Sequence, residues 1–340
     1  MKGLRIVGDR RAELVDLPRP HARPGWVVLR STVSAVCGSD LHNYRQDSAR
    51  LGARAERVAG HEPVGVVEDV GEAVEGLAQG SRVVVYQHFG CGACRYCRRG
   101  EPMFCHARQT MGNHVDGADA EYVAAPASTC LPLPDTLSDD VGALLACNFG
   151  TAFSGIRKLP VNSGDVVVVF GLGPVGCSAV IVAESDGATV VAVDPVQSRR
   201  EMAASLGAAV TVDPASGDAK AAVGDLTGGA GADACVDCSG SPKAQDEALA
   251  LLRPGGRMVV LAATAPWTFD PSQLWRRGLT IFGSWVYGLA EYDAAIRLAE
   301  RRKADLERLV THRFPGAEAE EAVRTADEAI SGKVLIDWTQ

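Results

Sequence analysis

Residues Val166 to Asp194 read VVVVFGLGPVGCSAVIVAESDGATVVAVD. The valine run before Gly171 predicts a buried strand, the GLGPVG segment a tight turn, and the apolar residues after it a helix that leads into a second buried strand. The apolar run from Val166 to Ala183 has the length of a membrane span, but Pro174 and the glycines of the turn favour a strand, a turn and a helix. The segment therefore predicts the first strands of a doubly wound parallel sheet.

The glycine spacing of this turn, GxGxxG, is typical of dinucleotide binding when it lies between a strand and a helix. Gly171 permits the turn, Gly173 lets a pyrophosphate approach the backbone, and Gly176 lets the helix pack closely on the strand. Asp194 lies at the end of the second strand, where a carboxylate can bind the adenosine ribose hydroxyls and repel a 2′-phosphate. We therefore expect NAD rather than NADP as the cofactor.

The pattern of strands and helices continues towards the C-terminus. A helix is expected from Ser198 to Leu206, and further strands are expected at Ala232 to Cys238, Gly256 to Ala262 and Leu279 to Gly283. The tail from about Leu289 reads helix, strand, helix, strand. Its last strand, Lys333 to Asp337, is expected to return to the first domain, because the parallel sheet already has its six strands.

The N-terminal part of the chain has a different pattern of apolar residues. Its Val-rich runs are short and are separated by glycine and proline, which predicts a β-rich domain; they are Trp26 to Val36, Pro63 to Val70 and Ser81 to Tyr86. We expect two domains. The first comprises residues 1–148 together with 288–340, and the second comprises residues 149–287.

Composition limits the classes of function. The chain has 340 residues, of which 46% are hydrophobic and 22% charged, as expected of a folded protein with about two domains. The net charge of −8 and the absence of a basic block argue against a nucleic-acid partner. The N-terminus has no apolar core before its charges begin, so we expect neither a signal peptide nor a membrane anchor, and a cytoplasmic location. Ten cysteines in such a chain favour metal or redox chemistry over disulfides.

Four of these cysteines form a compact motif in a loop. They are two CxxC steps and a fourth cysteine further on: Cys91, Cys94, Cys97 and Cys105. Four thiolates at this spacing are typical of a closed tetrahedral zinc site that stabilises a loop. The alternatives are four coincidental or redox-active cysteines, or His106 as a substitute ligand, which competes poorly with four cysteines.

A second set of zinc-binding residue types is dispersed along the chain. It comprises CGSDLH from Cys37 to His42, the His61-Glu62 pair about twenty residues later, and Cys147 well downstream. Cys37, His61 and Cys147 would give zinc three protein ligands and leave the fourth position for substrate, as a catalytic zinc requires.

The remaining cysteines carry no metal motif. Cys235 and Cys238 form a third CxxC, but residues three apart on a strand point to opposite faces and cannot share one ion. Cys130 and Cys177 are expected to be small buried apolar residues.

Together these motifs resemble the zinc-dependent alcohol dehydrogenases of the medium-chain dehydrogenase/reductase superfamily, over nearly the whole chain. The resemblance implies a β-rich GroES-like catalytic domain and a Rossmann coenzyme domain. It implies two zinc ions per chain, one catalytic on Cys37, His61 and Cys147, and one structural on the four-cysteine motif. It also implies a homo-oligomer, dimer or tetramer, because Leu279 to Gly283 matches an edge strand that pairs with its symmetry mate.

The resemblance implies roles for residues around the catalytic zinc. Ser39 would contact the alcohol, and His42 would form the solvent-side end of a proton relay that passes through the cofactor ribose. Asp40 would orient His61 by accepting its remaining N–H, and Glu62 would lie close behind the metal and assist ligand exchange.

On the cofactor side, the resemblance places Thr151 and Val175 beside the nicotinamide ring and Arg199 beside the adenosine ribose. The glycine turn, with Pro174 and Val175, would bind the pyrophosphate.

The expected activity is NAD-dependent, zinc-assisted oxidation of an alcohol, with a secondary alcohol or polyol preferred. Sorbitol-type relatives commonly use glutamate as the third ligand, yet no acid occurs between Val141 and Lys158, which leaves Cys147. One alternative is a zinc-free reductase of enones or quinones, whose members lack both ligand sets. The other alternative is a structural or sensor protein that is stabilised by zinc and binds NAD but turns over no substrate. The presence of Ser39 and His42 argues against it.

Overall fold

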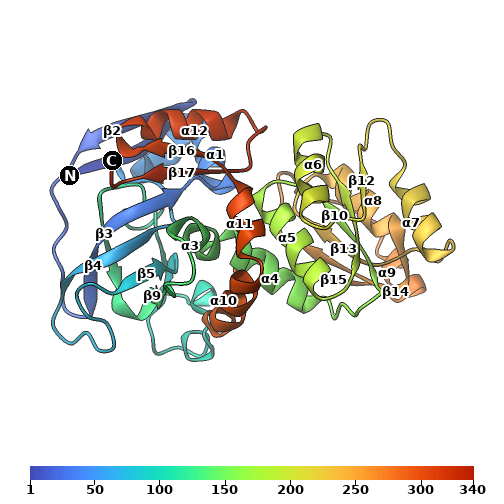
Figure 1. Ribbon diagram of the computed structural model, residues 1–340, viewed down its shortest axis with the longest axis horizontal. Helices are drawn as coiled ribbons and strands as arrows, with labels where there is room; N and C mark the ends of the chain where they lie inside the picture. Colours follow the sequence, from blue (N-terminus) through green and yellow to red (C-terminus); the bar gives the residue numbers. More distant parts are fainter. The chain divides into compact units, whose positions relative to one another are not determined.

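The computed structural model describes residues 1–340 and divides into two compact units (Figure 1). Unit 1 comprises Met1–Cys147 and Gly288–Gln340, and unit 2 comprises Asn148–Tyr287. No helix is long and apolar enough to cross a membrane.

Unit 2 is a doubly wound parallel sheet, which confirms the predicted fold class. Its strand order is β12-β11-β10-β13-β14-β15. The strands are β10 (Val166–Phe170), β11 (Thr189–Val193), β12 (Val210–Val212), β13 (Ala232–Asp237), β14 (Leu252–Val260) and β15 (Thr280–Gly283). The chain leaves β10 on one side and returns beside it as β13, so the direction of winding reverses between these two strands. Ligands of such sheets bind outside the carboxyl ends of the strands at this reversal.

Helices cover both sides of this sheet (Figure 1). They are α4 (Asn148–Lys158), α5 (Pro174–Ser185), α6 (Gln197–Ser205), α7 (Ala219–Thr227), α8 (Pro242–Leu251) and α9 (Ser272–Arg277). Val166, Val168 and Phe170 alternate along β10 and share one apolar cluster with Val223 of α7 and Leu249 of α8. The intervening Val167 and Val169 are also fully buried, as expected of a strand covered on both faces.

Unit 1 is built on a mainly antiparallel sheet of order β16-β17-β3-β4-β5-β9, with β8 also paired to β3. Its strands are β3 (Trp26–Ala35), β4 (Val64–Val70), β5 (Arg82–Val85), β8 (Tyr122–Pro126), β9 (Cys130–Pro132), β16 (Val310–Pro315) and β17 (Lys333–Asp337). β17 pairs antiparallel with β3, with Leu335 opposite Ala35. The C-terminal tail therefore extends the sheet formed by the N-terminal part of the chain.

The helices of unit 1 include α1 (Gly38–Arg45), α2 (Ser48–Leu51), α3 (Asp139–Ala146), α10 (Tyr292–Arg301), α11 (Lys303–Leu309) and α12 (Ala319–Asp327). Two short pairings complete it: β1 (Lys2–Gly8) with β2 (Arg11–Asp16), and β6 (His88–Phe89) with β7 (Gln109–Thr110). The β1–β2 hairpin was not predicted. Asp9 and Arg10 form its turn with positive φ, a conformation that is uncommon for arginine.

Several predicted boundaries were wrong by a few residues. The strand expected from Gly256 begins at Leu252 and ends at Val260, because Pro254 and Gly255 lie in an irregularity of the pairing with β13 and not in a turn before the strand. Cys238 follows the end of β13 instead of lying within it.

Candidate active site

Four potential metal ligands converge in unit 1. The donor atoms of Cys37, His61, Glu62 and Cys147 all lie within 4.8 Å of one another. Cys37 caps the start of α1, His61 and Glu62 precede β4, and Cys147 ends α3. Two helix ends and one strand start thus bring together residues that are far apart in the sequence.

Asp40 fixes the orientation of His61. Its Oδ2 accepts the backbone N–H of Cys37 at 2.9 Å, and its Oδ1 lies 3.3 Å from Nδ1 of His61. Asp40 and His61 are both buried. The contact at Nδ1 leaves Nε2 of His61 for the cluster, as the second-sphere carboxylate of a metal-bound histidine does.

The protonation of this cluster indicates a cation site. A hydrogen bond from Cys147 lowers the pKa of Cys37 well below its ordinary value, and the same bond raises the pKa of Cys147. Burial opposes charge on His61, but Asp40 and Cys37 raise its pKa above the ordinary value. Bound protons therefore balance the negative charge that gathers on the side chains of this cluster. Two thiols and an imidazole are the ligands zinc prefers, and zinc displaces such protons when it binds, so these residues fit a zinc ion.

Behind the cluster lies a buried ion pair that sequence reasoning missed. Lys333 of β17 contacts Oε2 of Glu62, and the two side chains are 1% and 0% exposed. Burial raises the pKa of Glu62 to about 8 despite the nearby ammonium group. The only signal in the sequence was a lysine opening the apolar strand KVLID, and this gave no indication of its partner.

The four-cysteine motif is also assembled. The sulfur atoms of Cys91, Cys94, Cys97 and Cys105 lie within 4.8 Å of one another. Backbone N–H groups, first that of Ala93 and then that of Cys94, lower the pKa of Cys91 to about 6. Burial raises the pKa of Cys97 to about 12 instead, so the fit to a closed zinc site rests on the four converging sulfur atoms and not on a shared acidity.

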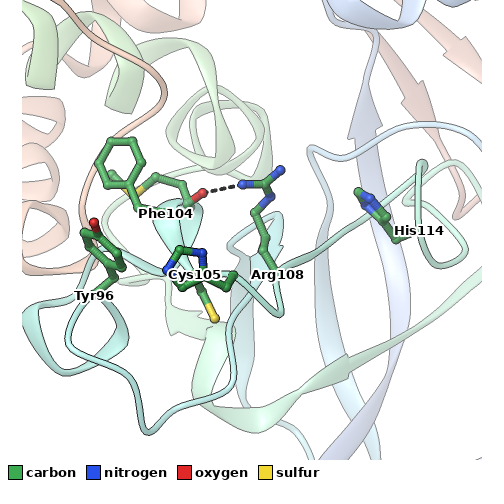
Figure 2. Close-up of a pocket in the computed structure, with 7 residues that line it drawn as sticks. Tyr96, Phe104, Cys105, Arg108 and His114 are labelled. Atoms are coloured by element: carbon green, nitrogen blue, oxygen red, sulfur yellow. Dashed lines mark hydrogen bonds between the residues drawn. The ribbon is translucent and has the colours of Figure 1, made fainter.

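His106 does not belong to this sulfur cluster. Its ring instead lies edge-on to Tyr96, with the ring centroids 6.1 Å apart. Both residues line a surface pocket of about 490 Å³ to which Cys105 contributes one wall. Figure 2 shows Arg108 in this pocket, donating a hydrogen bond to the carbonyl of Met103. No residue of the Cys37 cluster lines it.

The glycine turn in unit 2 has the shape of a phosphate cradle. A Cβ on Gly171, where φ is +82°, would lie 2.7 Å from the backbone of Ser239, and a Cβ on Gly176 would lie 1.8 Å from the carbonyl oxygen of Gly171. A Cβ on Gly173 would meet nothing within 4 Å, so the backbone is open there. Pro174 is the first residue of α5 and Val175 the second. No side chain fits at Gly171 or Gly176, and the backbone at Gly173 is open to a ligand. Together these properties fit a turn that binds a dinucleotide pyrophosphate.

Asp194 lies beside this turn at the end of β11. It is 3% exposed, and its two oxygens accept the backbone N–H groups of Leu172 and Val196 at 2.7 and 2.8 Å. Nη1 of Arg199 is 3.9 Å from Oδ2 of Asp194. Each carboxylate oxygen retains a lone pair, so the group can still accept hydrogen bonds from ribose.

The comparisons with known proteins agree with this geometry. Residues 23–135 match the alcohol dehydrogenase GroES-like domain, and residues 174–301 match the zinc-binding dehydrogenase domain. The L-threonine 3-dehydrogenase of Pyrococcus horikoshii is 33% identical over 330 residues, which cover 95% of this chain and 94% of the relative. The chain belongs to the zinc-type alcohol dehydrogenase family.

Solved structures of dehydrogenases share the fold of the whole chain. The alcohol dehydrogenase TADH from Thermus sp. ATN1 has a TM-score of 0.91 at 30% identity, with 99% of each chain covered. A zinc-binding dehydrogenase from Sinorhizobium meliloti 1021, solved with NADP bound, has a TM-score of 0.88 at 25% identity, covering 99% of this chain and 98% of that one. The chain is thus an oxidoreductase of the zinc-dependent alcohol dehydrogenase kind.

In this dehydrogenase, helices carry two residues expected in proton transfer and one expected beside the nicotinamide ring: Ser39, His42 and Thr151. Ser39 and His42 are exposed on α1, the helix that Cys37 caps. Thr151 is buried on α4, and its hydroxyl has no hydrogen-bond partner. A buried hydroxyl without a partner is a position where a ligand atom can supply the missing bond.

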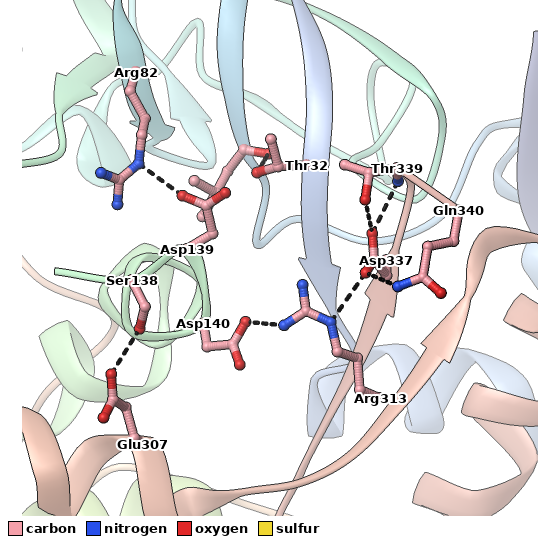
Figure 3. A network of polar contacts seen from close by, with 11 residues as sticks. Thr32, Arg82, Ser138, Asp139, Asp140, Glu307, Arg313, Asp337, Thr339 and Gln340 are labelled. Carbon is pink, nitrogen blue, oxygen red and sulfur yellow. Dashed lines mark hydrogen bonds and ion pairs between the residues drawn. The ribbon is translucent and has the colours of Figure 1, made fainter. Parts of the chain in front are cut away.

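A polar network holds the helix that ends at Cys147. Arg313 of β16 contacts Asp140 in the first turn of α3, and its Nε lies 3.1 Å from Oδ2 of Asp337 (Figure 3). Asp337 in turn accepts hydrogen bonds from Thr339 and Gln340. The C-terminal strands therefore help to position α3, a contribution that the sequence alone did not reveal.

Proposed function

We propose that this dehydrogenase oxidises a secondary alcohol or polyol with NAD as the hydride acceptor, and reduces the corresponding ketone in reverse. The observation that carries the proposal is the convergence of Cys37, His61 and Cys147 in one buried cluster. Glu62, the fourth donor of that cluster, is engaged by Lys333. Cys37, His61 and Cys147 then serve as three protein ligands and leave room for a substrate oxygen, whereas the four-cysteine site is complete without one. This difference supports one catalytic and one structural zinc per chain.

The residues of the cluster would have distinct tasks. A zinc ion held by Cys37, His61 and Cys147 supplies Lewis acidity, which lowers the pKa of an alcohol. Ser39 Oγ would accept the hydroxyl proton as its own hydroxyl proton is passed on towards His42, whose imidazole would accept a proton and release one to solvent. Asp40 holds His61 in the tautomer that leaves Nε2 for the metal.

Unit 2 would bind the cofactor. The nicotinamide ring, when bound, supplies the hydride-accepting carbon. Gly171, Gly173 and Gly176 receive the pyrophosphate, and Asp194 accepts hydrogen bonds from the adenosine ribose while its charge disfavours a 2′-phosphate. Thr151 and Val175 flank the nicotinamide.

The substrate class rests on the relatives. The L-threonine 3-dehydrogenase of Pyrococcus horikoshii is named for the 3-hydroxyl of threonine, which is a secondary alcohol. This name supports secondary alcohols, including amino alcohols, over primary alcohols for the present chain.

The test is a panel of substrates, assayed for formation of NADH or NADPH by the zinc-loaded protein. It contains secondary alcohols, polyols, L-threonine and other amino alcohols, cyclitols and primary alcohols, each with NAD and with NADP. We expect at least one secondary alcohol or polyol to be oxidised, with a higher kcat/KM for NAD. Cofactor binding without oxidation of any compound would favour a zinc-stapled NAD-binding protein without turnover.

A homo-oligomer is also part of the proposal. β15 is an edge strand of the parallel sheet, with no strand on its outer side, and an unpaired edge favours association. Light scattering that gave a mass near 35.7 kDa at all micromolar concentrations would contradict it.

A further inference from the structure

Two aspartates lie side by side at the cofactor edge of the unit 2 sheet. Asp194 follows β11, and Asp213 follows β12. These strands are parallel neighbours, with Val193 paired to Val212, so both carboxylates lie at the carboxyl edge of the sheet. Only Asp194 has a role in the proposed function.

Two arginines near the start of α6 pair with these aspartates. Nη1 of Arg200 donates to the carbonyl oxygen of Asp194 at 2.7 Å, and its Nη2 lies 3.4 Å from Oδ2 of Asp213. The Arg200 and Asp213 side chains are 17% and 27% exposed. Arg200 is thus held between the ends of β11 and β12.

Arg199 is held less firmly. Its closest carboxylate contact, to Asp194, is 3.9 Å long, and its buried Nε has no hydrogen-bond partner. The arginines therefore differ in their partners: the Asp194 carbonyl and the Asp213 carboxylate both engage Arg200, while Arg199 keeps unused donor capacity beside the proposed ribose site.

We propose that Asp213 is a specificity-determining residue that disfavours NADP by holding the Arg200 guanidinium away from the ribose 2′ position. The inference rests on the proposed use of NAD. A guanidinium released next to this position would bind a 2′-phosphate, because its planar N–H groups match phosphate oxygens. Asp194 repels the phosphate directly, and Asp213 withholds a second guanidinium, besides that of Arg199, that would compensate for that repulsion.

The conservative variant Asp213→Asn separates charge from structure. Oδ1 of Asp213 accepts the backbone N–H of Ala215 at 2.9 Å and so supports the turn after β12. An asparagine oxygen can keep this bond while the negative charge that faces Arg200 disappears.

Asp233 provides a matched control. One of its oxygens accepts the backbone N–H of Val166 at 2.8 Å, and the other lies 2.7 Å from Nε of Arg253. It therefore has the same two kinds of partner as Asp213. Asp233 lies near the start of β13, however, at the opposite edge of the parallel sheet.

The experiment measures dissociation constants of NADH and NADPH by nicotinamide fluorescence for the wild type, Asp213→Asn, Asp233→Asn and the double variant Asp213→Asn/Arg200→Met. We expect Asp213→Asn to tighten NADPH binding by about three- to tenfold and to change NADH binding by less than about twofold. Asp233→Asn should change neither. The double variant should lose the gain, which assigns it to Arg200. Asp213→Ser, which also keeps a turn-supporting oxygen, replaces Asp213→Asn if the latter fails to fold.

Two results would overturn the inference while leaving the proposed function intact. One is unchanged NADPH affinity in Asp213→Asn, and the other is the same gain in the double variant. A wild type that binds neither NADH nor NADPH would instead contradict the proposed function, so the two failures are distinguishable.

Discussion

Replacing Lys333 with methionine tests how the buried charge behind the cluster is balanced. Methionine keeps an unbranched side chain of similar length but removes the ammonium group, which leaves the fully buried Glu62 without its counter-ion. Breaking a buried pair by removing one partner costs about 3–5 kcal/mol. The side chains of Lys333 and Glu62 are 1% and 0% exposed, so this pair is fully buried. Burial is the largest influence on Glu62 and raises its pKa to about 8 even with Lys333 present. Loss of the lysine should raise it further, so proton uptake by Glu62 limits the loss to the low end of this range below about pH 8.

The matched control is Lys2→Met. Lys2 also forms an ion pair, at 2.9 Å with Asp16, but its side chain is 49% exposed and that of Asp16 is 79% exposed. Solvent screens such pairs, so this substitution should cost less than about 1 kcal/mol. The double variant Lys333→Met/Glu62→Gln should recover most of the loss, since no buried charge remains unpaired.

The assay is urea-induced unfolding of the zinc-loaded protein, read by hydrogen exchange in peptides from β3 and β17. This readout follows unit 1 separately, which matters because two units need not unfold in one step. A loss in Lys333→Met no larger than that in Lys2→Met, or a double variant as unstable as the single one, would show that the Lys333–Glu62 pair does not stabilise unit 1.

Three further outcomes are expected. His42→Ala should slow alcohol oxidation about 10- to 1000-fold without changing zinc content, because water partly replaces a proton relay; steady-state kinetics and metal analysis check this, and an unchanged kcat would remove His42 from the mechanism. Cys91→Ser should leave one zinc per chain and lower the melting temperature, measured by metal analysis and calorimetry, whereas two retained zinc ions would exclude the four-cysteine site. Burial, followed by the nearby Asp40, raises the pKa of Asp119 to about 7 from 3.8, so the folded state binds more protons than the unfolded state between about pH 4 and 7. The contribution of Asp119 to wild-type stability should therefore fall as pH rises through this window, by up to about 1.4 kcal/mol per pH unit. Asp119→Asn should remove that contribution in unfolding experiments at several pH values, and an identical pH dependence in the variant would contradict it.

The fold was predictable from sequence where the information is local. The segment from Val166 to Asp194 carries its own strand, turn and helix pattern, and Gly171 and Gly176 each have a steric reason that the structure makes explicit. The four-cysteine motif is likewise local, because its ligands lie within one loop and their spacing is visible in the sequence.

Contacts between distant segments were not predictable in this way. The pairing of Lys333 with Glu62 depends on β17 reaching β3, and the pairing of Arg313 with Asp140 depends on β16 lying near α3. Arg200 and Asp213 are close in sequence, but their contact requires β11 and β12 to be neighbours. A charged residue in a sequence shows that a partner is needed when it is buried, and only the three-dimensional structure shows which one.

In the proposed mechanism, a metal held by Cys37, His61 and Cys147 activates the alcohol. Measuring zinc content and NADH formation together for the wild type and Cys147→Ala tests this role. We expect two zinc ions per chain and turnover for the wild type, and one zinc ion with no turnover for Cys147→Ala. A Cys147→Ala protein that kept both zinc ions and its full rate would contradict this role, and the third ligand would then have to be sought elsewhere, first at Glu62.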